Sequence, residues 1–587
     1  MVAQNLKPAE IKCTIRKRLK KSVKKTCSVK TLKNRIPVLQ WLPNYNTDFL
    51  IQDIIAGLTV ALTAIPQGIA YAVIAGLPPE YGLYGSLTTG FVYMIFGSCK
   101  DVTVGPTAII STMTAKYASY SPDYAVLAAF LTGVATLLMG IFKLGFLVNF
   151  ISMPVISGFT TAAALQIAAS QLKAFFALNG PSGNFFAASV YNFVENIESA
   201  KIWDPILASV TIIMLIGLKR MGNGCSRTDG FIKKTRWFIS LARNAVVVVF
   251  GMILAYILKV TTNSEPLVLI GDIGGGLPTF GLPPFSTVSG NQTETFTDML
   301  RNLGPQFAIL PLVSILESVA IAKAFAEGGV VDATQEMYAV GFCNLVGSFA
   351  QSLPVTGSFT RTALNHVSGV KTTAGGVANS LLIIVALTLL TSTFYYIPKA
   401  SLAGLIITAM FSMIDYNMFF RLWRNSKMEL SLLIVTMTVS LFVGLEYGII
   451  AGIILEGLLL LYRTSVPPLQ IKVEGDLSEV IVLPLSDSLS YCAAEHLRKV
   501  IVKASHEADW EAILVIDGSN LKKMDSTVAS NLMILAKDFD KQSRCILFVN
   551  FQPELKDLCV DIQPEAENKF MITSSILDLV KSLRKKV

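Results

Sequence analysis

Two short segments, Gly105-Pro106-Thr107-Ala108-Ile109-Ile110 and Pro354-Val355-Thr356-Gly357-Ser358-Phe359-Thr360, decide the fold class of this 587-residue chain. Each begins at Pro or Gly-Pro, lies among long apolar runs and is too short to cross a bilayer, which takes about 20 helical residues. The N–H groups at a helix start have no partner within the helix, and lipid penalises each by several kcal/mol unless protein or a wet cavity faces it. The two segments therefore predict a pair of broken helices that meet at membrane depth.

The composition is that of a membrane protein. Hydrophobic residues make up 52% of the chain, charged residues 15%, and the mean hydropathy is +0.56. Too few polar residues remain to cover a water-soluble protein of this size. This excludes a secreted disulfide scaffold, a disordered chain and a cytosolic enzyme. The 8 cysteines form no CxxC pair and there are 3 histidines, so we expect neither a metal site nor a cofactor.

Apolar runs follow one another from about residue 50 to residue 463. Counted with the two short segments, they predict a polytopic α-helical membrane protein with 14 transmembrane segments. Because the short segments are third in each half, we expect two inverted repeats of seven, at about 48–260 and 303–464, within a transport domain spanning 48–464. The twelve longer runs lie near 52–73, 81–98, 123–143, 146–172, 203–218, 240–259, 305–323, 331–350, 376–393, 396–413, 428–444 and 447–463.

Basic residues indicate which connections face the cytosol. Residues 1–47 are rich in Lys and Arg, contain one acid, Glu10, and lack the apolar region of a signal peptide. They are interpreted as a cytosolic tail, or alternatively as a segment that contacts anionic membrane lipids. The basic connections 219–243 and 414–427 fit the same side. The net charge of +9 thus reflects membrane topology, and we expect no nucleic-acid partner.

The connection 260–304 is expected outside, because it carries one basic residue among several acids. It also contains the sequon Asn291-Gln292-Thr293, which makes Asn291 a candidate glycosylation site.

The paired helix starts predict a site for a small anion, since each helix N-terminus carries about half a positive charge. Arg361 lies seven residues beyond Pro354, the start of the second short segment. It either supplies further positive potential for the anion, or snorkels to the interface or neutralises an acid. Glu317 is an acid within an apolar run. It is either a proton-coupling group or a fixed structural partner of Arg361 or of a backbone donor.

The first apolar run contributes a third group of candidates. Pro66 and Gly68 lie close to Tyr71 and suggest a kinked helix beside a cavity. Gln67 offers amide donors to an oxyanion, and Tyr71 can line or gate the site. Ordinary helix packing explains the same spacing equally well.

Residues 465–587 alternate strand and helix patterns and predict a cytosolic α/β domain. The expected strands lie near 480–483, 512–516 and 545–549, and the expected helices near 487–506, 526–540 and 573–584.

Taken together, these features resemble the SulP (solute carrier 26) anion transporters over about residues 40–587. The matching motifs are long, and they lie at Ala56–Val60, Pro66–Gln67, Ala75–Tyr84, Asp101–Thr107, Pro154–Thr160, Leu316–Ala326 and Pro354–Arg361.

This resemblance implies a core domain and a gate domain followed by a cytosolic STAS domain, a homodimer, and elevator-type movement of the core against the gate. Carried over by motif, its anion site comprises Gln67, Tyr71, Thr107, Ala108, Ser358, Phe359, Thr360 and Arg361. The family's phenylalanine in the first span is Tyr71 here, which adds a hydroxyl. The Glu317 motif is similar to that of proton-coupled sulfate carriers, which favours a carrier over a motor.

The resemblance also carries a regulatory candidate. Thr527 matches the phosphorylated residue of bacterial anti-sigma antagonists, and phosphate is stabilised at a helix start. Contacts in the dimer and packing beneath the membrane domain are the alternative role for this turn.

The implied function is sodium-independent secondary transport of sulfate, chloride, bicarbonate or oxalate, by anion exchange or coupled to protons. Such a carrier breaks no covalent bond and is not an enzyme. A chloride-selective channel is the main alternative, and a nucleobase permease and a structural or motor protein are further ones. The sequence contains no P-loop, which disfavours an ATP-driven pump. The location is expected to be the plasma membrane or an endolysosomal membrane.

Overall fold

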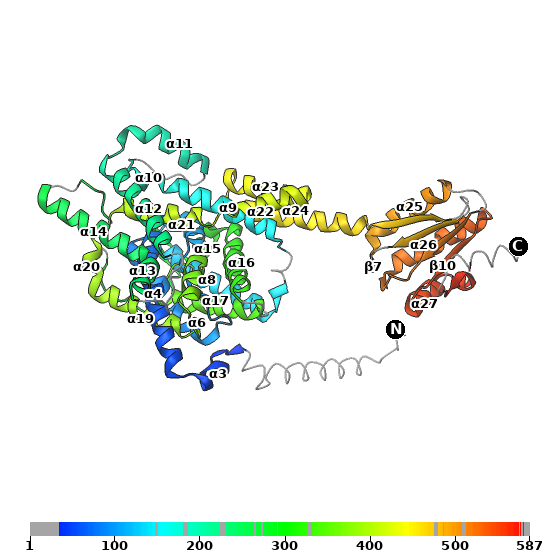
Figure 1. Ribbon diagram of the computed structural model, residues 1–587, viewed down its shortest axis with the longest axis horizontal. Helices are drawn as coiled ribbons and strands as arrows, with labels where there is room; N and C mark the ends of the chain where they lie inside the picture. Colours follow the sequence, from blue (N-terminus) through cyan, green and yellow to red (C-terminus); the bar gives the residue numbers. More distant parts are fainter. Residues whose placement is uncertain are drawn as a thin grey trace. The chain divides into compact units, whose positions relative to one another are not determined.

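A computed structural model describes residues 35–579 apart from gaps at 147–150, 180–185, 223–230, 263–265, 272–273, 290–291, 327–330, 475–478, 485, 508–511, 574–575 and 577–578 (Figure 1). Most of the basic region 1–47 therefore lies outside the described residues. The chain divides into two compact units, Met1–Ile453 and Ile454–Val587.

Helices occupy the apolar runs of the first unit. Seven helical stretches among the described residues are long and apolar enough to cross a membrane, as a multi-pass membrane protein requires. The arrangement of fourteen segments in two inverted repeats stays a prediction. The helices are α4 (Thr47–Ile74), α5 (Pro79–Leu87), α6 (Thr89–Phe96), α7 (Ala108–Ala118), α8 (Pro122–Ile141), α9 (Met153–Ser170), α12 (Trp203–Met221), α14 (Arg243–Thr262), α16 (Ile309–Phe325), α17 (Ala333–Ser348), α18 (Phe359–Val367), α19 (Gly375–Val385), α21 (Lys399–Phe411), α23 (Lys427–Phe442) and α24 (Leu445–Ser465).

Three boundaries differ from the sequence prediction. The run predicted from residue 146 becomes helix α9 only at Met153, because Pro154 favours the first turn of a helix over its interior. The run 81–98 is divided at Thr88 into α5 and α6. The run 376–393 contains a π-helix, Ala386–Leu390, between α19 and α20 (Thr391–Phe394).

Shorter elements join the long helices. They are α3 (Val38–Trp41), α10 (Leu172–Phe175), α11 (Phe186–Asn196), α13 (Phe231–Leu241), α15 (Phe296–Leu303), α22 (Tyr416–Asn425) and the hairpin of β2 (Thr287–Ser289) and β3 (Gln292–Glu294).

The long helices pack as two sets. In the first set, α4 contacts α5, α7, α18 and α19, while α17 lies against α6, α8 and α16. In the second set, α9 packs on α21 and α23, and α12 on α14 and α21. Contacts between the sets run mainly through α4 against α14 and α21, and through α7 against α9.

Glycine allows the closest approaches within the first set. A Cβ at Gly82 of α5 would lie 1.9 Å from the carbonyl oxygen of Gly68 in α4, and one at Gly90 of α6 would lie 2.0 Å from that of Gly376 in α19. No side chain fits at these distances, so small residues let the helix backbones touch. Dense packing of this kind makes the first set a rigid support for the half-helices that it contains.

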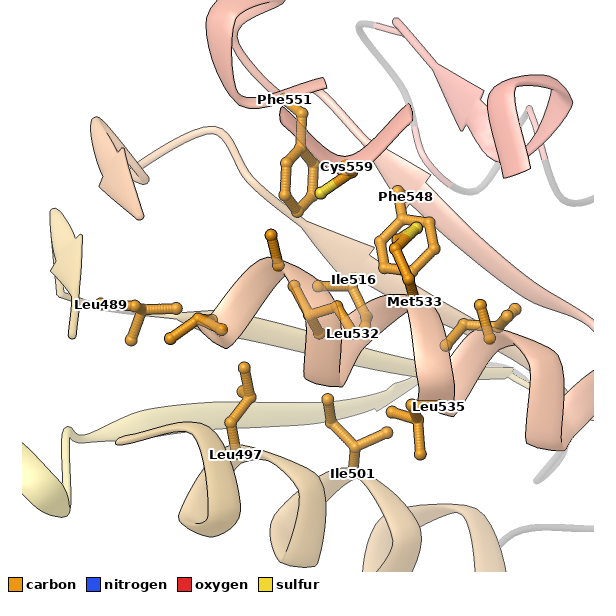
Figure 2. Packing of buried hydrophobic residues seen from close by; sticks show 14 of the residues in the cluster. Leu489, Leu497, Ile501, Ile516, Leu532, Met533, Leu535, Phe548, Phe551 and Cys559 are labelled. Atoms are coloured by element: carbon orange, nitrogen blue, oxygen red, sulfur yellow. The ribbon is translucent and has the colours of Figure 1, made fainter. Parts of the chain in front are cut away.

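The second unit contains a five-stranded sheet with the order β11-β10-β8-β6-β5. Strand β5 is antiparallel to β6, and the other neighbours are parallel. Alternate residues of β8 and β10 face opposite sides, and Ile516 and Phe548 pack under helices α25, α26 and α27 (Figure 2). The elements are β5 (Leu469–Glu474), β6 (Glu479–Pro484), β8 (Ile513–Asp517), β10 (Ile546–Val549), β11 (Phe570–Met571), α25 (Ala494–Glu507), α26 (Ser526–Lys541) and α27 (Pro553–Ile562).

The three predicted strands and the α/β class of this tail match the structure. The helix predicted over 487–506 is wrong at its start, because β7 (Ser488–Leu489) pairs there with β9 (Lys523–Met524). The carbonyl of Asp487 accepts hydrogen bonds from the N–H groups of Lys522 and Lys523, and this long-range pairing overrides the local helical pattern. The predicted helix 573–584 lies largely outside the described residues, although Ile576 and Leu579 pack against the second face of the sheet.

Candidate functional site

The two short segments meet through a pair of two-residue strands. Strand β1 (Val104–Gly105) pairs antiparallel with β4 (Thr356–Gly357), so that Val104 lies opposite Gly357 and Gly105 opposite Thr356. The N–H of Ser358 donates to the carbonyl of Thr103 at 2.9 Å and extends this pairing. Helices α7 and α18 begin directly after the strands, at Ala108 and Phe359. Two helix starts are thereby fixed side by side in the first helix set.

Buried polar side chains hold β4 in place. Asn344 of α17 accepts a hydrogen bond from the N–H of Val355 at 2.8 Å and donates to its carbonyl, also at 2.8 Å. Ser318 of α16 accepts from the N–H of Gly357 at 2.8 Å, and the hydroxyl of Thr356 donates to the carbonyl of Ser314 at 2.6 Å. Backbone N–H and C=O groups in this segment, which would be costly if left unpaired in lipid, are thus hydrogen-bonded within the protein.

Arg361 is fully buried at the third residue of α18. Its Nη2 donates to the carbonyl of Pro106 at 2.8 Å, whereas Nη1 has no hydrogen-bond partner among the described residues. Snorkelling to the interface is excluded by this burial. Gly105 makes the position possible, because a Cβ there would lie 3.0 Å from Nη2.

Glu317 lies on α16 and accepts a hydrogen bond from the hydroxyl of Thr107 at 3.3 Å. That hydroxyl also accepts from the N–H of Ile110 at 3.5 Å, so Thr107 is the cap of α7. In the described part of the chain, no ion pair joins Glu317 to Arg361. Among the described residues, the hydrogen-bond partner of Glu317 is the Thr107 hydroxyl, and neither Arg361 nor a backbone donor bonds to it.

Gln67 and Tyr71 are one turn apart on α4, which packs against both half-helices. Both are buried, and Oε1 of Gln67 has no hydrogen-bond partner among the described residues. Tyr71 lies close enough to Arg361 and Glu317 to interact electrostatically with both. Pro66 lies within the helix and removes one backbone donor beside Gln67.

The remaining candidates divide between the junction and its edge. Ala108 is the buried first residue of α7, and the buried hydroxyl of Ser358 lies 3.4 Å from that of Thr360. Phe359 is 48% exposed and its ring lies 5.4 Å from that of Phe325. The predicted anion-site residues thus lie at the starts of α7 and α18 or on α4, which packs against both, and the side chain of Phe359 packs at the edge.

A cavity of about 570 Å³ reaches this junction from between the two helix sets. Gln67 and Thr360 line it from the first set, and residues of α12, α14 and α21 line it from the second. Because one water occupies roughly 30 Å³, the cavity has room for a hydrated inorganic anion.

Two predicted modification sites lie elsewhere. Thr527 is exposed at the second residue of α26, where its carbonyl accepts from Asn531 and Asp525 caps the helix through the N–H of Val528. Asn291 lies outside the described residues. In the described part of the chain, no group of His, Cys, Asp and Glu could hold a metal ion.

Sequence reasoning missed the residues that hold β4, namely Ser314, Ser318 and Asn344. The available signal was the presence of polar side chains within apolar runs, but spacing alone does not reveal that they bind strand backbone. It also interpreted Lys219, Arg220 and Arg243 only as topology signals, whereas all three line the cavity.

The fold and the site define a helical membrane transport core with two half-helices, joined to an α/β domain. A family model described as the sulfate permease family matches residues 50–436, and a STAS domain model matches residues 470–572. The chain belongs to the sulfate permease family and carries a STAS domain.

Named relatives agree with this assignment. The sodium-independent sulfate anion transporter of Bos taurus is 39% identical over 538 residues, which cover 89% of this chain and 88% of that protein. The structure of murine solute carrier 26 member A9, an anion transporter in the inward-facing state, superposes with a TM-score of 0.81 at 23% identity, covering 95% of this chain and 96% of the other. The transmembrane domain of the cyanobacterial bicarbonate transporter BicA aligns with 70% of this chain and 98% of its own, with a TM-score of 0.55 at 19% identity.

Proposed function

We propose that this protein is a sodium-independent secondary transporter of sulfate and related small anions, including chloride, bicarbonate and oxalate. The observation that carries the proposal is the buried guanidinium of Arg361, whose Nη1 has no partner among the described residues. An arginine stays charged throughout the physiological pH range, so a buried one calls for an anionic partner. The sulfate transporter of Bos taurus supports sulfate as one of the substrates.

The proposed anion site combines this charge with backbone and amide donors. The starts of α7 and α18 add helix-dipole potential, and each half-helix contributes N–H groups that its own first turn leaves free. Gln67 can rotate its amide to donate, and Tyr71 and Thr360 supply hydroxyls. An oxyanion that sheds water here exchanges hydration for fixed dipoles and one guanidinium.

Transport is proposed to proceed by alternating access of the elevator type. The separate packing of the two helix sets supports a division into a moving core and a gate, and the strand pairing of the two short segments supports an inverted repeat. Without an anion, the uncompensated charge of Arg361 would oppose movement through the apolar gate. The same residue would therefore give both binding and coupling.

Glu317 is the proposed proton-coupling group. Its carboxylate contacts Thr107, the cap of α7, and therefore lies one hydrogen bond from a helix start of the anion site. A change in its protonation would alter the donor available at that helix start. The further proposals from the sequence are a homodimer, cytosolic termini, and residence in the plasma membrane or an endolysosomal membrane.

The proposal is tested by labelled sulfate uptake into proteoliposomes without sodium. The outside pH is set to 5.5 or 7.4 with the inside at 7.4, and internal chloride is present or absent. Uptake driven by external acid supports proton coupling, and uptake that requires internal chloride and ignores pH supports exchange. Large single-channel currents without saturable sulfate flux would contradict the proposal and favour a chloride channel.

A further inference from the structure

The cavity between the helix sets carries three cations that the proposed anion site does not use. Lys219 and Arg220 lie in the last turn of α12, and Arg243 is the first residue of α14. Asn244, Thr408 and Ser412 supply further polar side chains on this side of the cavity. Among the described residues that line the cavity, none is an acid, so no carboxylate neutralises the three charges there.

Arg243 is held in position more firmly than an exposed surface arginine. Its Nη1 donates to the carbonyl of Ser240 at 2.9 Å, and this is the one hydrogen bond of its guanidinium among the described residues. The other guanidinium donors of Arg243 remain for a ligand.

The cavity joins these cations to the buried site. Lys219, Arg220 and Arg243 line the same cavity as Gln67 and Thr360 of the anion site. The lining also includes apolar side chains such as Ile212 and Leu364, and apolar walls strengthen electrostatic attraction relative to open water.

We infer that Lys219, Arg220 and Arg243 form a second binding subsite, in which a small inorganic anion is held on the second helix set before it passes to Arg361. This inference rests on the proposed function and adds a step to it. Because α12 and α14 belong to the second set, the subsite stays in place when the first set moves. It therefore serves only anions that enter from the face onto which the cavity opens.

A sidedness experiment tests the subsite. Labelled sulfate influx is measured against sulfate concentration in sealed vesicles of both orientations, at high ionic strength, where attraction between distant charges is screened. Arg243→Gln is expected to raise the half-saturating sulfate concentration by roughly fivefold on the cavity face, the most that one partly exposed charge typically supplies, and to leave the opposite face unchanged. Lys259→Gln removes the same charge from the last turn of α14 and is expected to change neither face.

The inference would be overturned if Arg243→Gln had the same half-saturating sulfate concentration as the wild type on both faces, or if this concentration rose equally on both faces. Equilibrium binding of labelled sulfate to the full-length protein in detergent provides a second measurement. Two sites are expected for the wild type; Arg243→Gln is expected to weaken one of them by roughly fivefold, and Arg361→Gln to remove the other. A single wild-type site that survives Arg243→Gln and is lost with Arg361→Gln would remove the subsite and keep the proposed function. If the wild type shows no saturable sulfate flux, the proposed function is wrong. The equilibrium binding measurement would then still show whether the subsite exists.

Discussion

Asp53 and Arg361 are both buried in the first helix set, and their surroundings differ. Asp53 of α4, 1% exposed, accepts four hydrogen bonds: the N–H groups of Lys371 and Thr372 donate at 2.8 and 3.1 Å, and the hydroxyls of Thr372 and Tyr45 at 2.5 and 3.2 Å. Arg361, 0% exposed, makes one hydrogen bond and has a nitrogen without a partner among the described residues. A buried carboxylate whose oxygens both accept hydrogen bonds stabilises the fold. A buried guanidinium with an unpaired donor can bind an anion.

The largest expected effect is on anion affinity at Arg361. Arg361→Gln removes the charge and keeps an amide, and we expect sulfate affinity to fall by about a hundredfold with little change in thermal unfolding. Equilibrium binding and thermal unfolding in detergent measure the two quantities. Arg424→Gln, at an exposed arginine of α22, is the control and should change neither. Unchanged sulfate affinity in Arg361→Gln would contradict the site.

The opposite pattern is expected at Asp53. Asp53→Asn weakens charge-assisted bonds to the loop at 371–372 and should lower the free energy of unfolding by about 2 kcal/mol. Sulfate affinity of the folded fraction should stay within twofold. The exposed Asp48 lies on the same helix, so Asp48→Asn serves as the matched control in a denaturation series. A large loss of sulfate affinity in Asp53→Asn without loss of stability would contradict the purely structural role assigned to Asp53.

A smaller effect is expected from Gly105→Ala. The new methyl group would lie 2.9 Å from Oγ of Ser86 and 3.0 Å from Nη2 of Arg361, so the serine hydroxyl must shift and the guanidinium must give way slightly. We expect sulfate affinity to fall by roughly fivefold, equivalent to about 1 kcal/mol. Gly217→Ala on α12 meets no atom within 4 Å and should bind sulfate as the wild type does. Equal affinities for the two variants would show that the position of Arg361 is not critical.

At Glu317 we expect a small effect on affinity and a larger effect on the pH response. Glu317→Gln preserves the hydrogen-bonding shape beside Thr107, so sulfate affinity at neutral pH should change less than about threefold. The response of uptake to external acid should disappear, because the group can no longer take up a proton. Uptake measured across external pH values with the inside fixed at pH 7.4 checks both statements. A variant that keeps the full acid response would make Glu317 structural.

The sequence predicts the parts of the site that depend on local chemistry. The positions of Pro106 and Pro354 identify the half-helices, and a charge within an apolar run identifies Arg361 and Glu317. The charge pattern of the chain does not reveal their contacts, because Thr107 and Glu317, like Pro106 and Arg361, come from opposite halves of the chain.

Elsewhere in the fold, too, the sequence does not predict contacts between residues that are far apart along the chain. Asn344 reads as one polar residue among apolar neighbours, and only the folded chain places it against Val355. The sequence predicts helix where strand β7 lies, because its partner β9 comes much later in the sequence. Local sequence patterns indicate helix periodicity and turn chemistry, but they do not indicate which distant segments pair with each other.

The proposed anion site is tested most directly by determining the structure of the full-length protein in the presence of sulfate. We expect anion density within hydrogen-bonding distance, about 3 Å, of Nη1 of Arg361 and beside the starts of α7 and α18. An Nη1 that contacts a protein carboxylate, with sulfate density absent from the junction at saturating concentration, would contradict it.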